Sequence, residues 1–177
     1  MAGTLKVGTI TTPSGSGSIT IPSGVTLSGG MNPAFYAYLG SDQTGLGDDT
    51  NTKINIDTEV LDTDNCFASY KFTPNVAGKY FIYACINFDG GGTNQIRAND
   101  MRIYKNGSSI IQSTFNLTEN MGRITSPYVS VVVDANGSTD YFELYGQLNT
   151  NGGGTWSALG YASSQIRTFF GGYRIGA

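Results

Sequence analysis

The sequence predicts an all-β fold, an antiparallel sandwich or jelly roll, over most of its 177 residues. Short segments of alternating apolar and polar residues recur, and clusters of Gly, Asn, Asp and Ser separate them. No window shows the apolar period of 3.6 that marks a helix. Charged residues make up only 13%, while the chain has 25 Gly, 11 Tyr and 9 Phe. Many short strands joined by tight turns are typical of sandwiches and jelly rolls.

Residues 1–31 differ in kind from the rest. They contain no acidic residue, no aromatic residue and a single Lys, and short bursts of Thr, Ile and Val alternate with "TPSGSG" and "PSG". Such a segment cannot bury enough apolar surface to fold alone, but it could add its strands to another surface. We interpret it as an extended N-terminal docking arm; the alternative is a flexible linker.

Residues 32–177 are predicted to form one head domain made of strands. Turn compositions such as "KNGSS" and "DANGSTD" separate these strands, and Asn106-Gly107 is the signal of a two-residue hairpin. The expected strands are Ala34–Leu39, Thr52–Asp57, Phe67–Phe72, Gly78–Phe88, Ala98–Lys105, Ser108–Leu117, Ser126–Val133, Asp140–Gln147 and Arg167–Ile175.

The strand that contains "YFIYACINF" is apolar on both faces. Tyr80 and Ile82 project to one side, whereas Phe81, Tyr83 and Cys85 project to the other. One side can fill the space between two sheets. The rings on the second side would form an apolar patch larger than soluble monomers usually expose. A symmetric oligomer would cover this patch; the alternative is cover by loops of the same chain.

Several motifs resemble the C1q-like branch of the C1q/tumour-necrosis-factor (TNF) jelly rolls. "PAFYAYL" looks like the opening strand of that family, and "YKFTPNVAGKYFIYACINF" resembles its aromatic-x-Phe-x-x-Pro-x-x-Gly-x-Tyr signature. "MRIYKNGSSI" is similar to its Asn-Gly hairpin, and "RTFFGGYRIG" to its closing strand. The resemblance covers residues 33 to 176 in the family's order. The sequence has no Gly-X-Y collagen stalk of the kind found in that family, and the arm takes the place of this stalk.

The resemblance implies a ten-strand jelly roll that forms a homotrimer about a threefold axis, with loops at one end displayed for binding. Aromatic strands would line that axis. The trimer-core residues expected on this basis are Tyr80, Phe81, Tyr83, Tyr141, Tyr145, Phe170 and Tyr173.

The arm is similar to leader segments on virion appendage proteins of tailed bacteriophages. Together with the head, this resemblance implies a virion structural protein, either a fibre or a head-decoration protein. It would be made in the host cytoplasm, since no secretory signal is evident, and would bind other virion proteins through residues 1–31. The net charge of −3 disfavours nucleic acid, and no apolar stretch is long enough for membrane insertion.

The residue inventory disfavours an enzyme and predicts no cofactor. His is absent, which removes the usual general base and most zinc sites. The acidic residues show no spacing that would fix two carboxyl groups across a cleft, so a polysaccharide-degrading enzyme is the least favoured hypothesis. Cys66 and Cys85 are expected to be free thiols rather than a disulfide.

Two loop features leave alternatives open. Asp48 and Asp49, with Asp42 nearby, could supply oxygen ligands to Ca²⁺, or could belong to a solvated polar loop. Trp156 and Tyr161 lie in a Gly-rich segment, where they could stack on sugar rings of a host surface glycan. Trp156 could equally anchor its loop to the core. The stacking alternative gives a second hypothesis, a carbohydrate- or receptor-binding fibre-tip module.

Overall fold

The computed structural model describes residues 33–92, 95–117 and 122–176. The predicted docking arm, residues 1–31, lies outside these ranges. Within the described residues every regular element is a β-strand, and all strand pairs are antiparallel, so the all-β prediction is confirmed. None of these residues belongs to a helix with the length and hydropathy needed to cross a bilayer.

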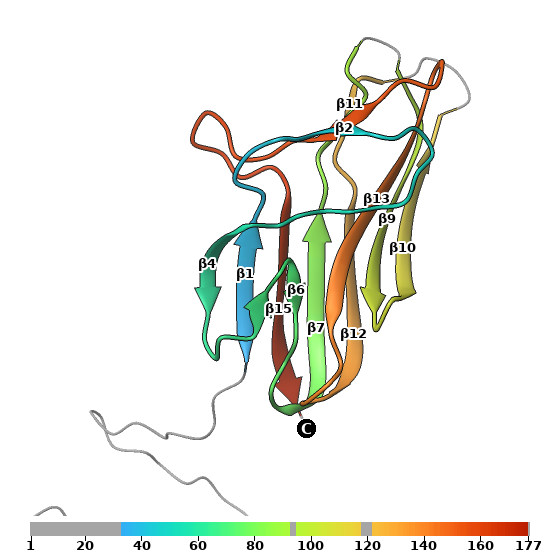
Figure 1. Cartoon of the computed structure of the whole chain (residues 1–177). Helices are drawn as coiled ribbons and strands as arrows, with labels where there is room; N and C mark the ends of the chain where they lie inside the picture. Colours follow the sequence, from blue (N-terminus) through green and yellow to red (C-terminus); the bar gives the residue numbers. More distant parts are fainter. Residues whose placement is uncertain (1–32, 93–94, 118–121, 177) are drawn as a thin grey trace, which may run out of the picture. The chain divides into compact units, whose positions relative to one another are not determined.

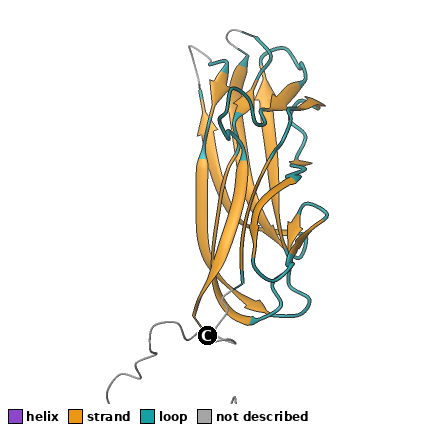
Figure 2. Ribbon diagram, turned by 90° about the vertical axis from the view of Figure 1, so that its left-hand side faces the viewer, coloured by secondary structure: helices purple, strands orange, loops and turns teal. Residues whose placement is uncertain are grey.

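The strands lie in two layers that face each other (Figures 1 and 2). The first layer, sheet I, has the order β12-β7-β15-β1-β4. The second, sheet II, has the order β10-β9-β13-β6-β5, with β3 also paired to β13, and a smaller ladder β11-β8-β14-β2 lies at the loop end of the molecule. The strands are β1 (Ala34–Tyr38), β2 (Gln43–Leu46), β3 (Thr52–Lys53), β4 (Thr58–Asp62), β5 (Phe67–Ala68), β6 (Lys71–Phe72), β7 (Ala77–Cys85), β8 (Phe88–Asp89), β9 (Ile96–Lys105), β10 (Ser108–Asn116), β11 (Ile124–Thr125), β12 (Tyr128–Asn136), β13 (Phe142–Thr150), β14 (Trp156–Ala158) and β15 (Phe169–Gly176).

The core between the sheets is built from one face of each long strand. Along β7, Tyr80, Ile82 and Ala84 have no exposed surface, and their neighbours are partly exposed, as the period of two predicts. Phe35 of β1 stacks on Phe72 of β6 with ring centroids 4.3 Å apart, which joins the two sheets. The apolar face assigned from the sequence is therefore the interior face.

The Asn-Gly hairpin between β9 and β10 is confirmed. Asn106 and Gly107 have φ angles of 53° and 79°, the left-handed conformation that such two-residue turns require. The Asn106 side chain donates to the carboxylate of Asp140 at 2.7 Å. This bond, with a further one from Lys105, lowers the pKa of Asp140. The turn is thus held by a charged acceptor from the next hairpin.

The predicted strand Phe67–Phe72 is instead two short strands, β5 and β6, joined by a tight turn. Ser69 and Tyr70 form the turn, with φ angles of 53° and 61°. A continuous strand would send Phe67 and Phe72 to opposite faces because their separation is odd. The turn pairs the two residues directly, and both are buried. Burial of two phenylalanines thus outweighs the continuity of the strand.

The other differences fall in short elements. The predicted strand Thr52–Asp57 keeps regular pairing only at β3, although Ile54 and Ile56 beyond it are fully buried. Strands β2, β4, β11 and β14 were not predicted. β2 and β14 border Gly-rich segments and span only four and three residues, too few for an alternation to be recognised.

Tyr80 should make stability depend on alkaline pH. Burial between the sheets raises its pKa to about 12, and its hydroxyl donates to the Val76 carbonyl at 2.6 Å. In the unfolded chain a phenol ionises near pH 10, so the folded state binds the proton more tightly. The stabilisation is therefore complete below pH 10 and is lost as pH rises to about 12. The loss is on the order of 2–3 kcal/mol.

Urea unfolding of the wild type and of Tyr80→Phe between pH 9 and 12 tests this. The variant should be less stable at pH 9, by about 1 kcal/mol for the lost hydrogen bond, but its stability should fall less steeply above pH 10. Tyr70→Phe, at an exposed position, serves as the control. Parallel curves for wild type and Tyr80→Phe would contradict the assignment.

Candidate functional site

The outer face of sheet I is lined with aromatic side chains. The strand register places the rings in rows: Tyr36 lies beside Gly171, which pairs with Tyr83, and Tyr173 pairs with Phe81. We call this surface the aromatic face; it comprises Tyr36, Tyr38, Leu61, Phe81, Tyr83, Cys85, Tyr128, Val132, Phe169 and Tyr173.

Most rings of the aromatic face form a continuous network centred on Tyr83. The Tyr83 ring lies 5.8 Å from that of Phe81 and 6.3 Å from that of Phe169, measured between centroids. Phe81 continues to Tyr173 at 5.6 Å, and Phe169 to Tyr128 at 6.5 Å. The network spans β7, β15, β1 and β12.

The Gly171-Gly172 pair of β15 accommodates rings on both sides of sheet I. A Cβ atom on Gly171 would lie 2.5 Å from the Tyr83 ring, so that ring packs directly on the backbone of β15. A Cβ atom on Gly172 would lie 2.6 Å from Ile82 in the core. "FFGGY" therefore encodes a close approach from each face rather than a turn, since neither glycine has a positive φ.

The aromatic face stays partly open in the single chain. Tyr173 is 45% exposed, Tyr128 53% and Val132 55%. Burial raises the pKa of Tyr36, Tyr83 and Tyr128, so these phenols stay neutral at physiological pH. The face is thus large, apolar and uncharged.

The outer face of sheet II is different in character. It carries ion pairs, among them Lys53–Glu143 at 2.6 Å and Arg102–Asp100 at 2.7 Å. Tyr145 packs on Tyr104 with ring centroids 4.3 Å apart, within this polar surface. These ion pairs are satisfied within the sheet, so this part of the face suits solvent.

The three candidate calcium ligands are not brought together. Asp42 accepts from the Gly160 amide at 2.7 Å and lies 3.3 Å from Arg167, whereas Asp48 accepts from the amide and hydroxyl of Thr150. Asp49 accepts from the side chain of Gln147. Among the described residues no three His, Cys, Asp or Glu side chains form a group that could hold a metal ion. In the structure these three carboxylates each hold a loop through hydrogen bonds.

Trp156 is buried, so the sugar-stacking alternative is wrong for this residue. It is 1% exposed, its indole N–H donates to the Gly47 carbonyl at 3.0 Å, and its ring contacts that of Phe88. Trp156 therefore anchors the Gly-rich segment to the core. Tyr161 is 44% exposed, and its ring packs 5.6 Å from that of Tyr38, at the border of the aromatic face.

Cys66 and Cys85 are both free thiols, as expected. Cys66 is buried, and Cys85 belongs to the aromatic face. Burial raises the pKa of each thiol, which keeps both in the unreactive protonated form at neutral pH.

No model of a known protein family matches the sequence, and no curated protein matches it. Solved structures do match. Murine APRIL superposes with a TM-score of 0.57 at 12% identity, covering 82% of this chain and 100% of that chain. The globular domain of zebrafish complement 1qA gives 0.53 at 14% identity, covering 82% and 98%. Eiger TNF from S. frugiperda gives 0.54 at 10% identity, covering 82% and 93%.

The chain has the C1q/TNF jelly-roll fold. The fold predicted from the motifs is thereby confirmed, and identities this low show the fold alone.

Within the C1q/TNF-like head, the seven expected trimer-core residues divide into three groups. Phe81, Tyr83 and Tyr173 lie on the aromatic face. Tyr80 and Phe170 are fully buried inside one chain, where neither can contact another copy. The remaining two, Tyr141 and Tyr145, lie on the side of sheet II, where Lys71 sits over the Tyr141 ring at 5.0 Å.

Sequence reasoning missed four rings of the aromatic face, Tyr36, Tyr38, Tyr128 and Phe169. The alternation separates the two faces of each strand but does not say which face points inward. A usable signal was the alternation of purely apolar residues with tyrosines along one strand. Phe35 and Ala37 lie on one face of β1 and Tyr36 and Tyr38 on the other, and Phe170 and Phe169 of β15 also lie on opposite faces.

Trp156→Ala should destabilise the head rather than remove a ligand contact. Loss of this buried side chain leaves a cavity and removes one of the two hydrogen bonds to the Gly47 carbonyl, at a cost of about 3–5 kcal/mol in the free energy of unfolding. Tyr161→Ala, at an exposed position in the following loop, should cost under about 1 kcal/mol. Thermal unfolding of both variants measures this. Similar melting temperatures for wild type and Trp156→Ala would contradict a structural role.

Proposed function

We propose that this protein is a non-enzymatic structural protein of a tailed-bacteriophage virion, a fibre or head-decoration protein. Its C1q/TNF-like head forms a homotrimer through the aromatic face, and residues 1–31 dock the trimer onto other virion proteins. The loop end of the head is displayed outward. The protein acts without a cofactor.

The aromatic face carries the self-association part of this proposal. Burying a ring of this kind contributes up to about 3 kcal/mol, and two of the rings, Tyr128 and Tyr173, are about half exposed in the single chain. A second copy of the same chain suits the face because the rings are neutral and already ordered by their mutual contacts. The trimer itself is the stoichiometry implied by the C1q/TNF resemblance.

The virion part rests on residues 1–31. Their composition, with Thr, Ser, Gly and Ile in short bursts, resembles the leader segments of phage appendage proteins. The described head begins at Pro33, whose carbonyl accepts from the amide of Arg174 near the end of β15. β1 therefore starts at the end of sheet I that is opposite the loop end of the head.

The non-enzymatic part rests on the residue inventory. The chain has no His, and the carboxylates of Asp42, Asp48 and Asp49 serve as hydrogen-bond acceptors that fix loops. Asp89 lies 3.3 Å from Arg123 and accepts from the Gly91 amide, which is again a structural arrangement.

A single charge on the aromatic face should dissociate the assembly. Val132 is 55% exposed, so Val132→Glu leaves the chain's own core intact but places an unpaired carboxylate in the interface, at a cost of several kcal/mol. Ser109→Glu, at an exposed position of β10 in sheet II, is the matched control. Light scattering after size exclusion should show Val132→Glu as a folded monomer. The control should keep the wild-type mass, and a wild-type mass for Val132→Glu would place the interface elsewhere.

Removal of the arm should separate assembly from docking. A chain lacking residues 2–31 should fold and self-associate like the full chain, yet it should be absent from purified phage particles. Mass spectrometry of particles produced with each version measures incorporation. Normal incorporation of the shortened chain would show that docking does not depend on residues 1–31.

Attachment to a host surface glycan is a second candidate role for the displayed end. Trp156 is buried and cannot serve it. A polar hollow at the end of sheet II favours it, as follows.

A further inference from the structure

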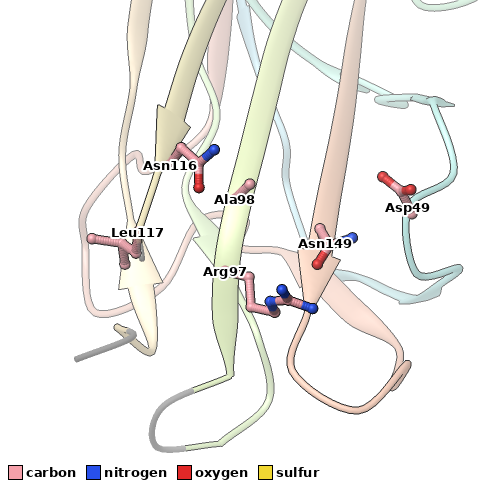
Figure 3. A pocket seen from close by; sticks show the side chains of 6 residues that line it. All are labelled: Asp49, Arg97, Ala98, Asn116, Leu117 and Asn149. Atoms are coloured by element: carbon pink, nitrogen blue, oxygen red, sulfur yellow. The ribbon is translucent and has the colours of Figure 1, made fainter. Parts of the chain in front are cut away.

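A polar hollow lies where β9, β10 and β13 meet the loop end of sheet II. Its volume is about 390 Å³, and its lining residues are Asp49, Arg97, Ala98, Asn116, Leu117 and Asn149 (Figure 3). This volume lies near the lower end of the range of small-molecule sites in proteins. None of the lining residues belongs to the aromatic face.

The floor of the hollow is explained by the strand register. Asn116 of β10, Ala98 of β9 and Asn149 of β13 are direct neighbours across the sheet. Asn99 and Leu148, which follow and precede them, are buried, so this row faces outward. The small side chain of Ala98 between two longer Asn side chains leaves a depression bordered by two amide groups.

A β-bulge in β9 places the positively charged residue Arg97 at the hollow. Ala98 pairs with Asn149 and Ile96 pairs with Thr150, so Arg97 is an extra residue in β9 that has no partner in β13. Bulges re-aim the side chain of the extra residue and recur beside functional sites. The Leu117 amide donates to the Arg97 carbonyl at 2.8 Å and holds this backbone in place. Figure 3 shows Arg97 beside Asn149 in the middle of the hollow, with Asp49 on one side of them and Asn116 and Leu117 on the other.

Arg97 contrasts with the other arginine of the same strand. Arg102 is fully used: it donates to Asp100, Gln112, Asn51 and Gln147 at 2.7 to 3.0 Å. The Arg97 guanidinium has no hydrogen bond or ion pair with any described residue, although it could offer five donors. One arginine of β9 thus maintains the sheet, and the other is available to a ligand.

The two asparagines are available too. Neither Asn116 nor Asn149 makes a side-chain hydrogen bond within the described residues, and of the Asp49 carboxylate only Oδ1 is used, by Gln147 at 2.7 Å. The hollow thus offers the guanidinium of Arg97 near its middle, an amide on either side of β9 and the Asp49 carboxylate at one edge. Donors and acceptors in this mixture match a ligand that has hydroxyl groups and one negative charge.

We propose that this hollow binds an acidic sugar unit of a surface polysaccharide, with the sugar carboxylate on Arg97 and the hydroxyl groups on Asn116, Asn149 and Asp49. Arg97 can grip a carboxylate through two parallel hydrogen bonds. Asp49 repels a second negative charge at the far side, which orients the sugar and disfavours polyphosphates. This proposal specifies the class of ligand for the attachment role, and it rests on that proposed role.

Titration of the purified full-length protein tests this site without any virion, so its failure is separate from failure of the docking proposal. The probes are oligosaccharides that contain glucuronic, galacturonic or sialic acid, and the same compounds with each carboxyl group reduced to an alcohol. The wild type should bind at least one acidic probe by calorimetry, and should bind its reduced form at least tenfold more weakly.

Two variants and one control assign the binding to the hollow. Arg97→Gln should weaken binding of the acidic probe at least tenfold and remove the preference over its reduced form. Ala98→Ile, which fills the floor with a residue suited to a strand, should abolish binding of both. Arg123→Gln changes an exposed arginine at the same end of the head that does not line the hollow, and it should bind like the wild type.

Three results would overturn the proposal. They are binding of none of the acidic probes by the folded wild type, unchanged binding by Arg97→Gln, and equal binding of sodium acetate and the acidic sugars. The last result would reveal a simple anion site. Circular dichroism of each variant confirms that it is folded.

Discussion

The packing of the Tyr83 ring on the backbone of Gly171 is the contact on which the outer face of sheet I depends. Because β15 has no side chain at that point, the hydroxyl end of the ring packs directly on the strand, and Phe81, Phe169 and Tyr36 surround the ring. Rings ordered in this way lose little conformational freedom when a partner covers them. A monomer gains little from such order on its surface, whereas an assembly gains a preformed interface.

The two sheets divide the tasks of the head. Sheet I presents neutral rings, and sheet II presents paired charges such as Lys53–Glu143 and the network around Arg102. The proposed association through sheet I would leave sheet II and its polar hollow free to contact solvent or a ligand. Two neighbouring residues of β9 form the hollow: the small side chain of Ala98 leaves the depression, and the bulge at Arg97 places a guanidinium beside it. In this proposal the sheets form a rigid scaffold, and the residues that bind the ligand lie at its edge.

The sequence predicted the fold because alternation, Asn-Gly turns and the order of family-like motifs all depend on local spacing. It also showed that β7 is apolar on both sides. It could not show which side of each strand faces the other sheet, so Tyr80 and Phe170 were assigned to an interface although both are interior. The burial of Trp156 and the bulge at Arg97 depend on contacts between segments far apart in the chain, and composition does not encode these. The Ser69-Tyr70 turn is local, but it forms because both Phe67 and Phe72 are buried against the rest of the core. The aspartates of the loops looked like ligands because their hydrogen-bond donors, Gly160, Thr150 and Gln147, are distant in sequence.

The central claim is that one chain exposes a ring-lined sheet that only further copies of itself can cover. Sedimentation equilibrium of the wild-type protein over a hundredfold range of dilution tests it most directly. The account predicts a mass three times the 18.8 kDa of the chain that persists on dilution into the nanomolar range. A well-folded species of 18.8 kDa at every concentration, with the rings of the aromatic face in contact with solvent, would contradict it.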